Sequence, residues 1–229
     1  MIVLWELEGR GGRRYSLFSW RTRMALRHKG LDFETRPVAM SDKAAIAFSG
    51  GKTVPVIRDG PDGEAVRDSW AIAEYLEARY PAAPPLFGGD IGRGVTHAFN
   101  VWVDRAIVPA MLPVIVADIH ERVVPADDGF FRQMMEGIVK RTLEDARAGR
   151  EQALGRLASA IAPLQAALKR QPYVSGAQPA YADYILFSVF QWARVMSPQE
   201  VLAPAEPLFS WREKMLELFG GFARNVPVA

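Results

Sequence analysis

The sequence predicts a mixed α/β domain over residues 1–80, a linker over 81–90 and an all-α domain over 91–229. Three observations predict this architecture. In the first part, β-branched runs alternate with helical patterns, as expected for a small sheet covered by helices. The stretch P-A-A-P-P-L-F-G-G-D sustains no regular structure and is typical of a linker. Beyond it, apolar residues recur at helical spacing almost throughout.

The first domain is predicted in the order β-α-β-α-β-β-α. Strands are expected at residues 2–7, 32–38, 53–58 and 64–67, and helices at 16–29, 41–48 and 68–80, the second of them short or irregular. The β-α-β units give parallel neighbours, and the turn at residues 59–63 gives an antiparallel edge pair. In the second domain, helices are expected at 94–119, 130–148, 152–169, 180–196 and 209–218.

The composition is that of a globular protein without a nucleic-acid surface. Of 229 residues, 49% are hydrophobic and 24% are charged, which is ordinary for a packed chain. The 28 basic and 26 acidic residues leave a net charge of +2, and no long basic run could follow a phosphate backbone. We therefore expect no nucleic-acid partner.

Cysteine is absent, so disulfides, thiolate metal sites and a cysteine nucleophile are excluded. Any sulfur chemistry must come from a bound ligand. His28, His97 and His120 lack ligand-like spacing, and no metal is predicted. The N-terminus lacks a basic leader and no apolar run approaches ~18 residues. We therefore expect a cytoplasmic protein with no membrane partner.

The helix at residues 16–29 is the most informative element. Ser16 can cap its first turn and Gly30 can end its last. A hydroxyl at the positive end of a helix, just after a short apolar strand, can hold an anion or a thiolate, because unpaired N–H groups and the helix dipole point there. We interpret this segment as an active-site helix.

Three fragments carry a resemblance to a known family. They are S-x-x-S-W-R-x-R-x-A-L from Ser16, V-P-V-I at residues 54–57 and D-S-W-A-I-A-E-Y-L from Asp68. In this order and spacing the chain resembles soluble glutathione transferases of the serine type, over nearly its whole length. The resemblance implies a thioredoxin-like N-terminal domain, an all-helical C-terminal domain, glutathione as the cofactor and a homodimer.

The resemblance implies that Ser16 donates a hydrogen bond to the glutathione thiolate, with the helix dipole favouring the charge. Ser19, one turn later, is the alternative hydroxyl. Serine also fills the N-cap position constantly, so Ser16 taken alone would be read as a cap.

The resemblance further implies that Val54, followed by a cis Pro55, pairs its backbone with the cysteinyl part of glutathione, like an added strand. Only about 5–6% of X-Pro bonds are cis, so the residues alone favour a trans proline. Ser69 and the first N–H groups of its helix are expected to take the γ-glutamyl carboxylate, and Asp68 the α-amino group, although Asp68 also suits a cap. Lys52 is a weaker candidate for the glycyl carboxylate.

In the second domain, A-Y-A-D-Y-I-L from Ala180 resembles the helix that buries a capping aspartate in this fold, which makes Asp183 structural. The usual Ser or Thr three residues earlier is Ala180. The reciprocal hydroxyl contact is therefore missing, and the helix start loses ~1 kcal/mol.

Longer strings resemble one subgroup, the bacterial β-etherases, which are glutathione transferases that cleave β-aryl ethers. They are F-S-W-R-T-R-M-A-L-R-H-K-G, R-T-L-E-D-A-R-A-G-R-E, V-F-Q-W-A-R and D-S-W-A-I-A-E-Y-L. The implied reaction is attack by the glutathione thiolate on a hydrophobic, aromatic electrophile, with an aryloxide leaving. Candidates for the wall of the substrate pocket are Trp102, Ile107, Met111, Ile115, Phe187 and Trp192. Most such residues are core, and we expect about one in three at the pocket.

Two alternatives remain open at this level. One is a transferase of the same fold with another electrophile, or a glutathione-dependent isomerase, since a fold does not fix chemistry. The other is a low-turnover protein that binds glutathione or another ligand, in which Asp68-Ser69 and Val54-Pro55 stay necessary and Ser16 does not.

Overall fold

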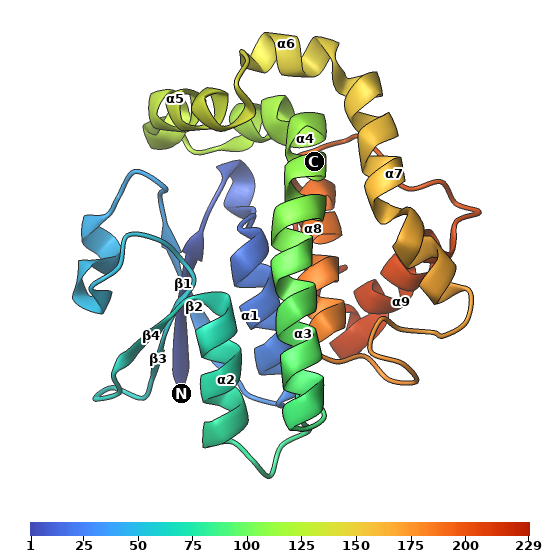
Figure 1. The fold of residues 1–229 in the computed structure, drawn as a ribbon. Helices are drawn as coiled ribbons and strands as arrows, with labels where there is room; N and C mark the ends of the chain where they lie inside the picture. Colours follow the sequence, from blue (N-terminus) through green and yellow to red (C-terminus); the bar gives the residue numbers. More distant parts are fainter.

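The computed structural model describes all of residues 1–229, and a four-stranded sheet organises the first domain (Figure 1). The strands β1 (Ile2–Leu7), β2 (Phe33–Val38), β3 (Val56–Asp59) and β4 (Ala65–Arg67) lie in the order β2-β1-β3-β4. β1 and β2 are parallel, whereas β3 runs antiparallel to both β1 and β4. This mixed sheet confirms the predicted order of elements.

The sheet is covered on both faces. Helices α1 (Leu17–His28) and α2 (Ser69–Arg79) share the main hydrophobic core with the inward side chains of β1. On the other face, Trp5 packs with Ile46 of the 3-10 segment η2 (Ala44–Ser49) in a small second core. The period-two alternation of β1 sends side chains to these two cores in turn.

The strand predicted at residues 53–58 begins later, at Val56. Pro55 has no N–H to donate to the ladder, so regular pairing starts only after it. The peptide bond between Val54 and Pro55 is cis, as the family resemblance implied.

Seven helices make up the second domain, with a π-helical turn in the first long run. They are α3 (Asp90–Trp102), the π turn η3 (Val103–Ile107), α4 (Val108–Arg122), α5 (Asp128–Val139), α6 (Leu143–Ala148), α7 (Arg150–Leu168), α8 (Tyr181–Met196) and α9 (Pro207–Gly221). A short 3-10 turn, η4 (Pro125–Asp127), precedes α5. In Figure 1, α3 and α4 run as one long rod, and α5 lies across its upper end.

The single helix predicted at residues 130–148 was wrong, because the structure has two helices there. Lys140 ends α5 in the left-handed region with φ 56°. Thr142 then caps α6, where its Oγ1 accepts the Asp145 N–H at 3.0 Å. Apolar residues continue at helical spacing across the break, so the pattern of hydrophobicity did not reveal it.

The rod at Asp90–Arg122 is the one helix of the chain long and apolar enough, by length and composition, to cross a membrane. The core helix of a globular domain passes the same test. Here α4 packs against α7 and α8, and many of its apolar residues belong to the main core.

Asp183 lies at the start of α8 and is fully buried. Its two carboxylate oxygens accept hydrogen bonds from the N–H groups of Val174, Ser175 and Ala180 and from the indole of Trp211, at 2.7 to 3.2 Å. In a reciprocal capping pair, a side-chain oxygen at position 180 would also accept the N–H of Asp183. Alanine has no such oxygen, as expected, so only the hydrogen bond from the Ala180 N–H to Asp183 is present. Asp183 ties a loop and α9 to the start of α8.

A buried arginine joins the two domains. Arg21 of α1 is 1% exposed, and it donates to Asp104 at 2.6 Å and to Asn100 at 2.8 Å. A buried guanidinium needs such partners to offset its lost hydration. A second link is the hydroxyl of Tyr181, which donates to the carbonyl of Ser69 at 2.6 Å.

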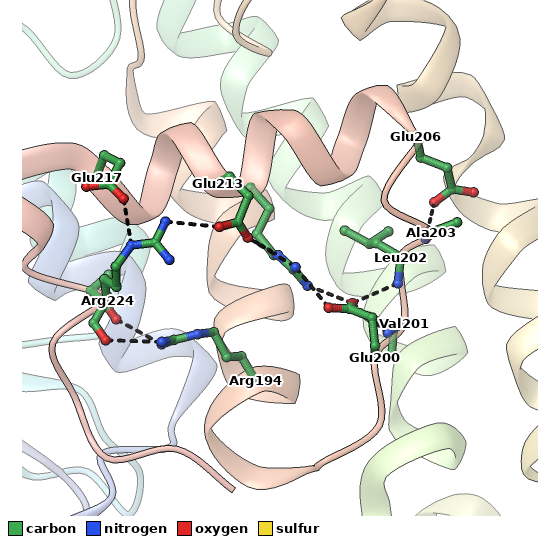
Figure 2. Close-up of polar contacts among 11 residues, drawn as sticks. Arg194, Glu200, Val201, Leu202, Ala203, Glu206, Glu213, Glu217 and Arg224 are labelled. Carbon is green, nitrogen blue, oxygen red and sulfur yellow. Dashed lines mark hydrogen bonds and ion pairs between the residues drawn. The ribbon is translucent and has the colours of Figure 1, made fainter.

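The C-terminal segment folds back over α8 and α9 (Figure 2). Arg224 pairs with Glu213 and Glu217, while Arg194 donates to the carbonyls of Ala223 and Arg224. These contacts place the ring of Phe222 beneath Arg23 of α1, 5.0 Å from the guanidinium carbon. The end of the chain therefore helps to hold the first domain against the helices.

Candidate active site

A cavity of about 600 Å³ lies between the sheet domain and helices α4, α5 and α8. Its two walls differ in chemistry. The first domain contributes every polar side chain of the lining, namely Ser16, Asp42, Lys43, Lys52, Thr53 and Asp68 beside the phenol of Tyr15. The helical domain contributes only apolar ones, namely Val108, Pro109, Leu112, Ile119, Phe131, Met134, Met135, Ile138 and Trp192.

Ser16 is the N-cap of α1 and lines the cavity. Its Oγ accepts the N–H of Ser19 at 3.2 Å, which leaves the hydroxyl proton free to donate. Ser19 is 1% exposed, does not line the cavity, and its hydroxyl has no partner. Of the two candidate hydroxyls, only Ser16 reaches the cavity, and it lies where the helix dipole is positive.

Val54 and Pro55 both line the cavity. Among the hydrogen bonds that lie outside regular helices and strands, none uses the N–H or the C=O of Val54. A backbone amide with no partner inside the chain is available to a peptide-like ligand.

Asp68 caps α2, and its side chain also lines the cavity. Oδ1 accepts the N–H groups of Trp70 and Ala71, at 2.9 and 3.1 Å, whereas Oδ2 has no partner in the chain. The backbone of Asp68 has φ 73°, an uncommon conformation for a residue with a side chain. Ser69, in contrast, is 3% exposed and does not line the cavity.

Two lysines on the first-domain wall have no carboxylate partner. Lys52 was a sequence candidate, and Lys43 was missed. The ammonium of Lys43 lies 5.3 Å from the ring centroid of Phe130 in α5. No local signal marks Lys43, because its place depends on how the segment after β2 meets α5.

That segment is held from the other domain. Asp127 is fully buried and accepts the N–H groups of Met40 and Ser41 at 2.7 and 2.8 Å, and the hydroxyl of Ser41 at 2.6 Å. Charge-assisted bonds of this kind are stronger than neutral ones. They fix the rim of the cavity that carries Met40 and Lys43.

Of the six residues expected in the substrate pocket, only Trp192 lines this cavity. Ile107, Met111, Ile115 and Phe187 are fully buried in the core, and Trp102 is half-buried outside the cavity. The residues of α4 that do line it include Val108 and Leu112, one position further along than two of those expected. One residue turns a helix by about 100°, so a shift of one position exchanges the core face for the cavity face.

Two family models match the chain. The one described as "Glutathione S-transferase, C-terminal domain" matches residues 94–211, more than half of the chain, and "Glutathione S-transferase, N-terminal domain" matches residues 15–79. The chain therefore belongs to the glutathione S-transferase family. Glutathione is the cofactor of this family, as predicted.

Curated relatives resemble part of the chain. A zeta-class glutathione S-transferase of Euphorbia esula is 32% identical over 120 residues, which are 48% of this chain and 52% of that protein. A probable maleylacetoacetate isomerase of Caenorhabditis elegans is 33% identical over 95 residues, which are 40% and 44% of the two chains. The chain thus spans about half the length of these relatives.

Solved structures agree over the whole chain. A glutathione S-transferase of Ceriporiopsis subvermispora in complex with glutathione is 25% identical and has a TM-score of 0.82, covering 100% of this chain and 99% of its own. A glutathione transferase of Phanerochaete chrysosporium is 26% identical, with a TM-score of 0.76 over 96% and 92% of the two chains. The thioredoxin-like domain followed by a helical domain is confirmed.

Proposed function

We propose that this chain is a glutathione transferase that joins the thiol of glutathione to an apolar, aromatic electrophile. The division of the cavity carries this proposal. The charged side chains of its lining all come from the first domain, the helical domain supplies only apolar side chains, and Ser16 lies on the polar wall at a helix N-terminus. An acidic peptide thiol and an apolar partner would each find a matching surface.

The polar wall fits the groups of glutathione. Lys43 and Lys52 offer cations to a carboxylate, and Oδ2 of Asp68 offers an acceptor to an ammonium. The backbone of Val54 offers a donor and an acceptor to the cysteinyl unit. We propose that Pro55 shapes this segment and that the backbone N–H of Ser69 binds the γ-glutamyl carboxylate, because Asp68 Oδ1 already accepts the next two N–H groups of α2, those of Trp70 and Ala71.

Ser16 and α1 supply the electrostatics. The free hydroxyl proton of Ser16 donates to the sulfur, and the helix dipole stabilises its negative charge, so that the thiol ionises nearer to neutral pH. A sulfur–carbon bond then forms while the bond from that carbon to the leaving group breaks, and the leaving group takes the electron pair. The apolar wall contributes by holding the electrophile beside the sulfur.

β-aryl ether cleavage is the particular case that the sequence strings suggest, with an aryloxide as the leaving group. A glutathione-dependent isomerase is the second candidate, because relatives include a probable maleylacetoacetate isomerase. Maleylacetoacetate is a dicarboxylate, however, and the wall formed by the helical domain has no cation. Desolvating a carboxylate there would be costly, which favours an uncharged aromatic substrate.

We also propose a cytoplasmic homodimer. Ile91 and Val95 on α3 are 85% and 66% exposed, which leaves apolar surface available to a second copy. Sedimentation velocity tests this, and a monomer at micromolar concentration would contradict it.

The function is tested by calorimetry with glutathione, followed by turnover of an α-keto β-aryl ether with a coloured phenol. Binding together with phenol release supports the β-etherase case. Binding with turnover of other aromatic electrophiles alone supports a general transferase. Unchanged turnover in Ser16→Ala would overturn the assignment of Ser16, and glutathione binding with no turnover of any electrophile would favour a carrier.

A further inference from the structure

Trp20 of α1 is fully buried, and its indole N–H is hydrogen-bonded to the chain that enters this helix. It lies one turn after Ser16, and its Nε1–H donates to the carbonyl of Arg14 at 2.8 Å. Among the hydrogen bonds that lie outside regular helices and strands, no backbone N–H donates to that carbonyl. The indole is therefore the group that links α1 to the segment just before Ser16.

The spacing of this contact is that of a staple at a helix start. Ser16 is the N-cap of α1, so Trp20 is the fourth residue of the helix and Arg14 lies two residues before the cap. In many helices a side chain at the fourth position packs against the residue before the cap and fixes the angle at which the chain enters. Here the indole makes a hydrogen bond, which fixes direction as well as distance. A change in the entry angle would turn the Ser16 side chain with it.

The entering segment has little else to fix its conformation. Gly11 and Gly12 have φ 67° and 74°, so the loop before Arg14 is built on residues with the greatest backbone freedom. The cap is a long hydrogen bond, since Oγ of Ser16 accepts the Ser19 N–H at 3.2 Å, the upper end of the usual range. The direction of the Ser16 hydroxyl therefore depends on how Arg14 is held.

The groups around this contact are themselves held in place. The guanidinium carbon of Arg23 lies 4.7 Å from the centroid of the Trp20 ring, and Arg23 pairs with the buried Glu6 at 2.6 Å. The carboxylate of Glu6 also lies 3.4 Å from Nε of Arg14. Side chains locked by packing and by further hydrogen bonds can keep a functional group within the small tolerance that catalysis requires. Both sides of the contact between Trp20 and Arg14 are therefore fixed.

We propose that Trp20 is a positioning residue for Ser16, because its indole N–H holds the Arg14 carbonyl and so directs the Ser16 hydroxyl toward the sulfur of bound glutathione. The inference rests on the proposed function for the thiolate, and it adds a residue that touches neither substrate. Trp20 does not line the cavity, so its effect on the thiol acts through Ser16.

The test removes the N–H group at position 20. Trp20→Phe does so with a loss of volume, and replacement of Trp20 by 3-benzothienylalanine does so while the shape of the indole is kept. The matched control is Trp211→Phe, because the Trp211 indole is also buried and donates a hydrogen bond, at 2.9 Å, to Asp183 in the helical domain. Both phenylalanine variants should unfold at lower urea concentration than the wild type.

Only the changes at Trp20 should alter the thiol. We expect both of them to raise the thiol pKa of bound glutathione, followed by thiolate absorbance against pH, by about 0.5–1 unit, and to lower kcat about three- to tenfold. A misdirected donor stabilises the thiolate less. Binding of S-methylglutathione, which has no thiol, should stay within about twofold of the wild type. Trp211→Phe should leave the thiol pKa and kcat unchanged.

Hydrogen exchange tests the geometry without glutathione. In the benzothienylalanine variant, the Ser19 amide that donates to Ser16 should exchange faster than in the wild type, whereas the Met24 amide further along α1 should not. Equal exchange of the Ser19 amide in the two proteins would overturn the proposal.

The outcomes separate this role from the proposed function. An unchanged thiol pKa in both Trp20 variants, or an equal rise in Trp211→Phe, would overturn the role of Trp20 and leave the transferase function in place. A wild type that does not bind glutathione would overturn the proposed function and the role of Trp20 with it.

Discussion

Two aspartates begin helices in this chain, and their surroundings are opposite. Asp183 at α8 is fully buried, and four N–H groups occupy both of its oxygens. Asp68 at α2 is exposed, uses one oxygen as a cap and leaves the other at the cavity. Each has the sequence signature of a capping residue. Saturated hydrogen bonding marks the structural aspartate, and a free oxygen on a cavity wall marks the binding one.

The same distinction applies to the other polar groups. Every polar side-chain atom of Asp127 and Arg21 has a partner within the chain, and both residues join the two domains. Ser16 lines the cavity with a hydroxyl proton that the fold does not use, and Asp68 with a carboxylate oxygen that has no partner. If the distinction holds, substitutions in the first group change the free energy of unfolding, and those in the second change ligand affinity or rate.

The largest effect is expected for Asp183→Asn. The amide nitrogen cannot accept, so two N–H groups lose a charged acceptor at about 1.5–3 kcal/mol each, and the free energy of unfolding should fall by about 3–5 kcal/mol. Urea unfolding measures this. Asp90→Asn at the exposed start of α3 is the control and should cost less than about 0.5 kcal/mol. If Asp183→Asn lowered the free energy of unfolding only slightly, the contrast between a structural Asp183 and a binding Asp68 would be wrong.

Next in size is the effect of Ser16→Ala on rate. Loss of a hydrogen bond to a charged sulfur should lower kcat/KM about 10- to 100-fold and raise the pKa of bound glutathione, followed by thiolate absorbance against pH. Ser16→Thr keeps the hydroxyl and the cap and should recover most of the rate. Ser19→Ala, away from the cavity, should stay within about threefold. Equal losses at both serines would contradict the assignment.

These contrasts also show what the sequence could predict. The caps at Ser16 and Asp68 and the order of strands and helices depend on neighbours within a few residues, so local patterns revealed them, whereas the structural role of Asp183 was expected from the family resemblance. The face of α4 that meets the cavity depends on how helices pack over long range, and the expected Ile107, Met111 and Ile115 lie in the core instead.

Lys43 was missed for a related reason. Lys43 reaches the cavity only because Asp127 holds the adjoining segment from the other domain.

A smaller effect is expected for Asp68→Asn. Asparagine caps helices as well as aspartate does, so the free energy of unfolding should change by less than about 0.5 kcal/mol. The missing charge should weaken glutathione binding about tenfold, because the ammonium loses its ion pair. Calorimetry with glutathione, and with a derivative that lacks the α-amino group, separates the two roles. A variant that binds both ligands as the wild type does would remove Asp68 from the site.

The smallest effect concerns pH and a saturated group, His28. Its ring nitrogens lie 2.7 Å from the Tyr184 hydroxyl and 3.0 Å from the Pro85 carbonyl. Burial lowers the pKa of His28 below its ordinary 6.5, outweighing the hydrogen bond to Pro85, so the folded ring stays neutral where the unfolded one gains a proton. This contribution to stability is complete above about pH 6.5 and declines as pH falls through the folded pKa. The wild type should therefore lose stability relative to His28→Gln on acidification, measured by urea unfolding. Since His28 lies outside the cavity, glutathione affinity should be the same in both proteins at each pH. A pH-dependent difference in affinity would show that a saturated group can also act at the site, and would limit the distinction drawn from the two aspartates.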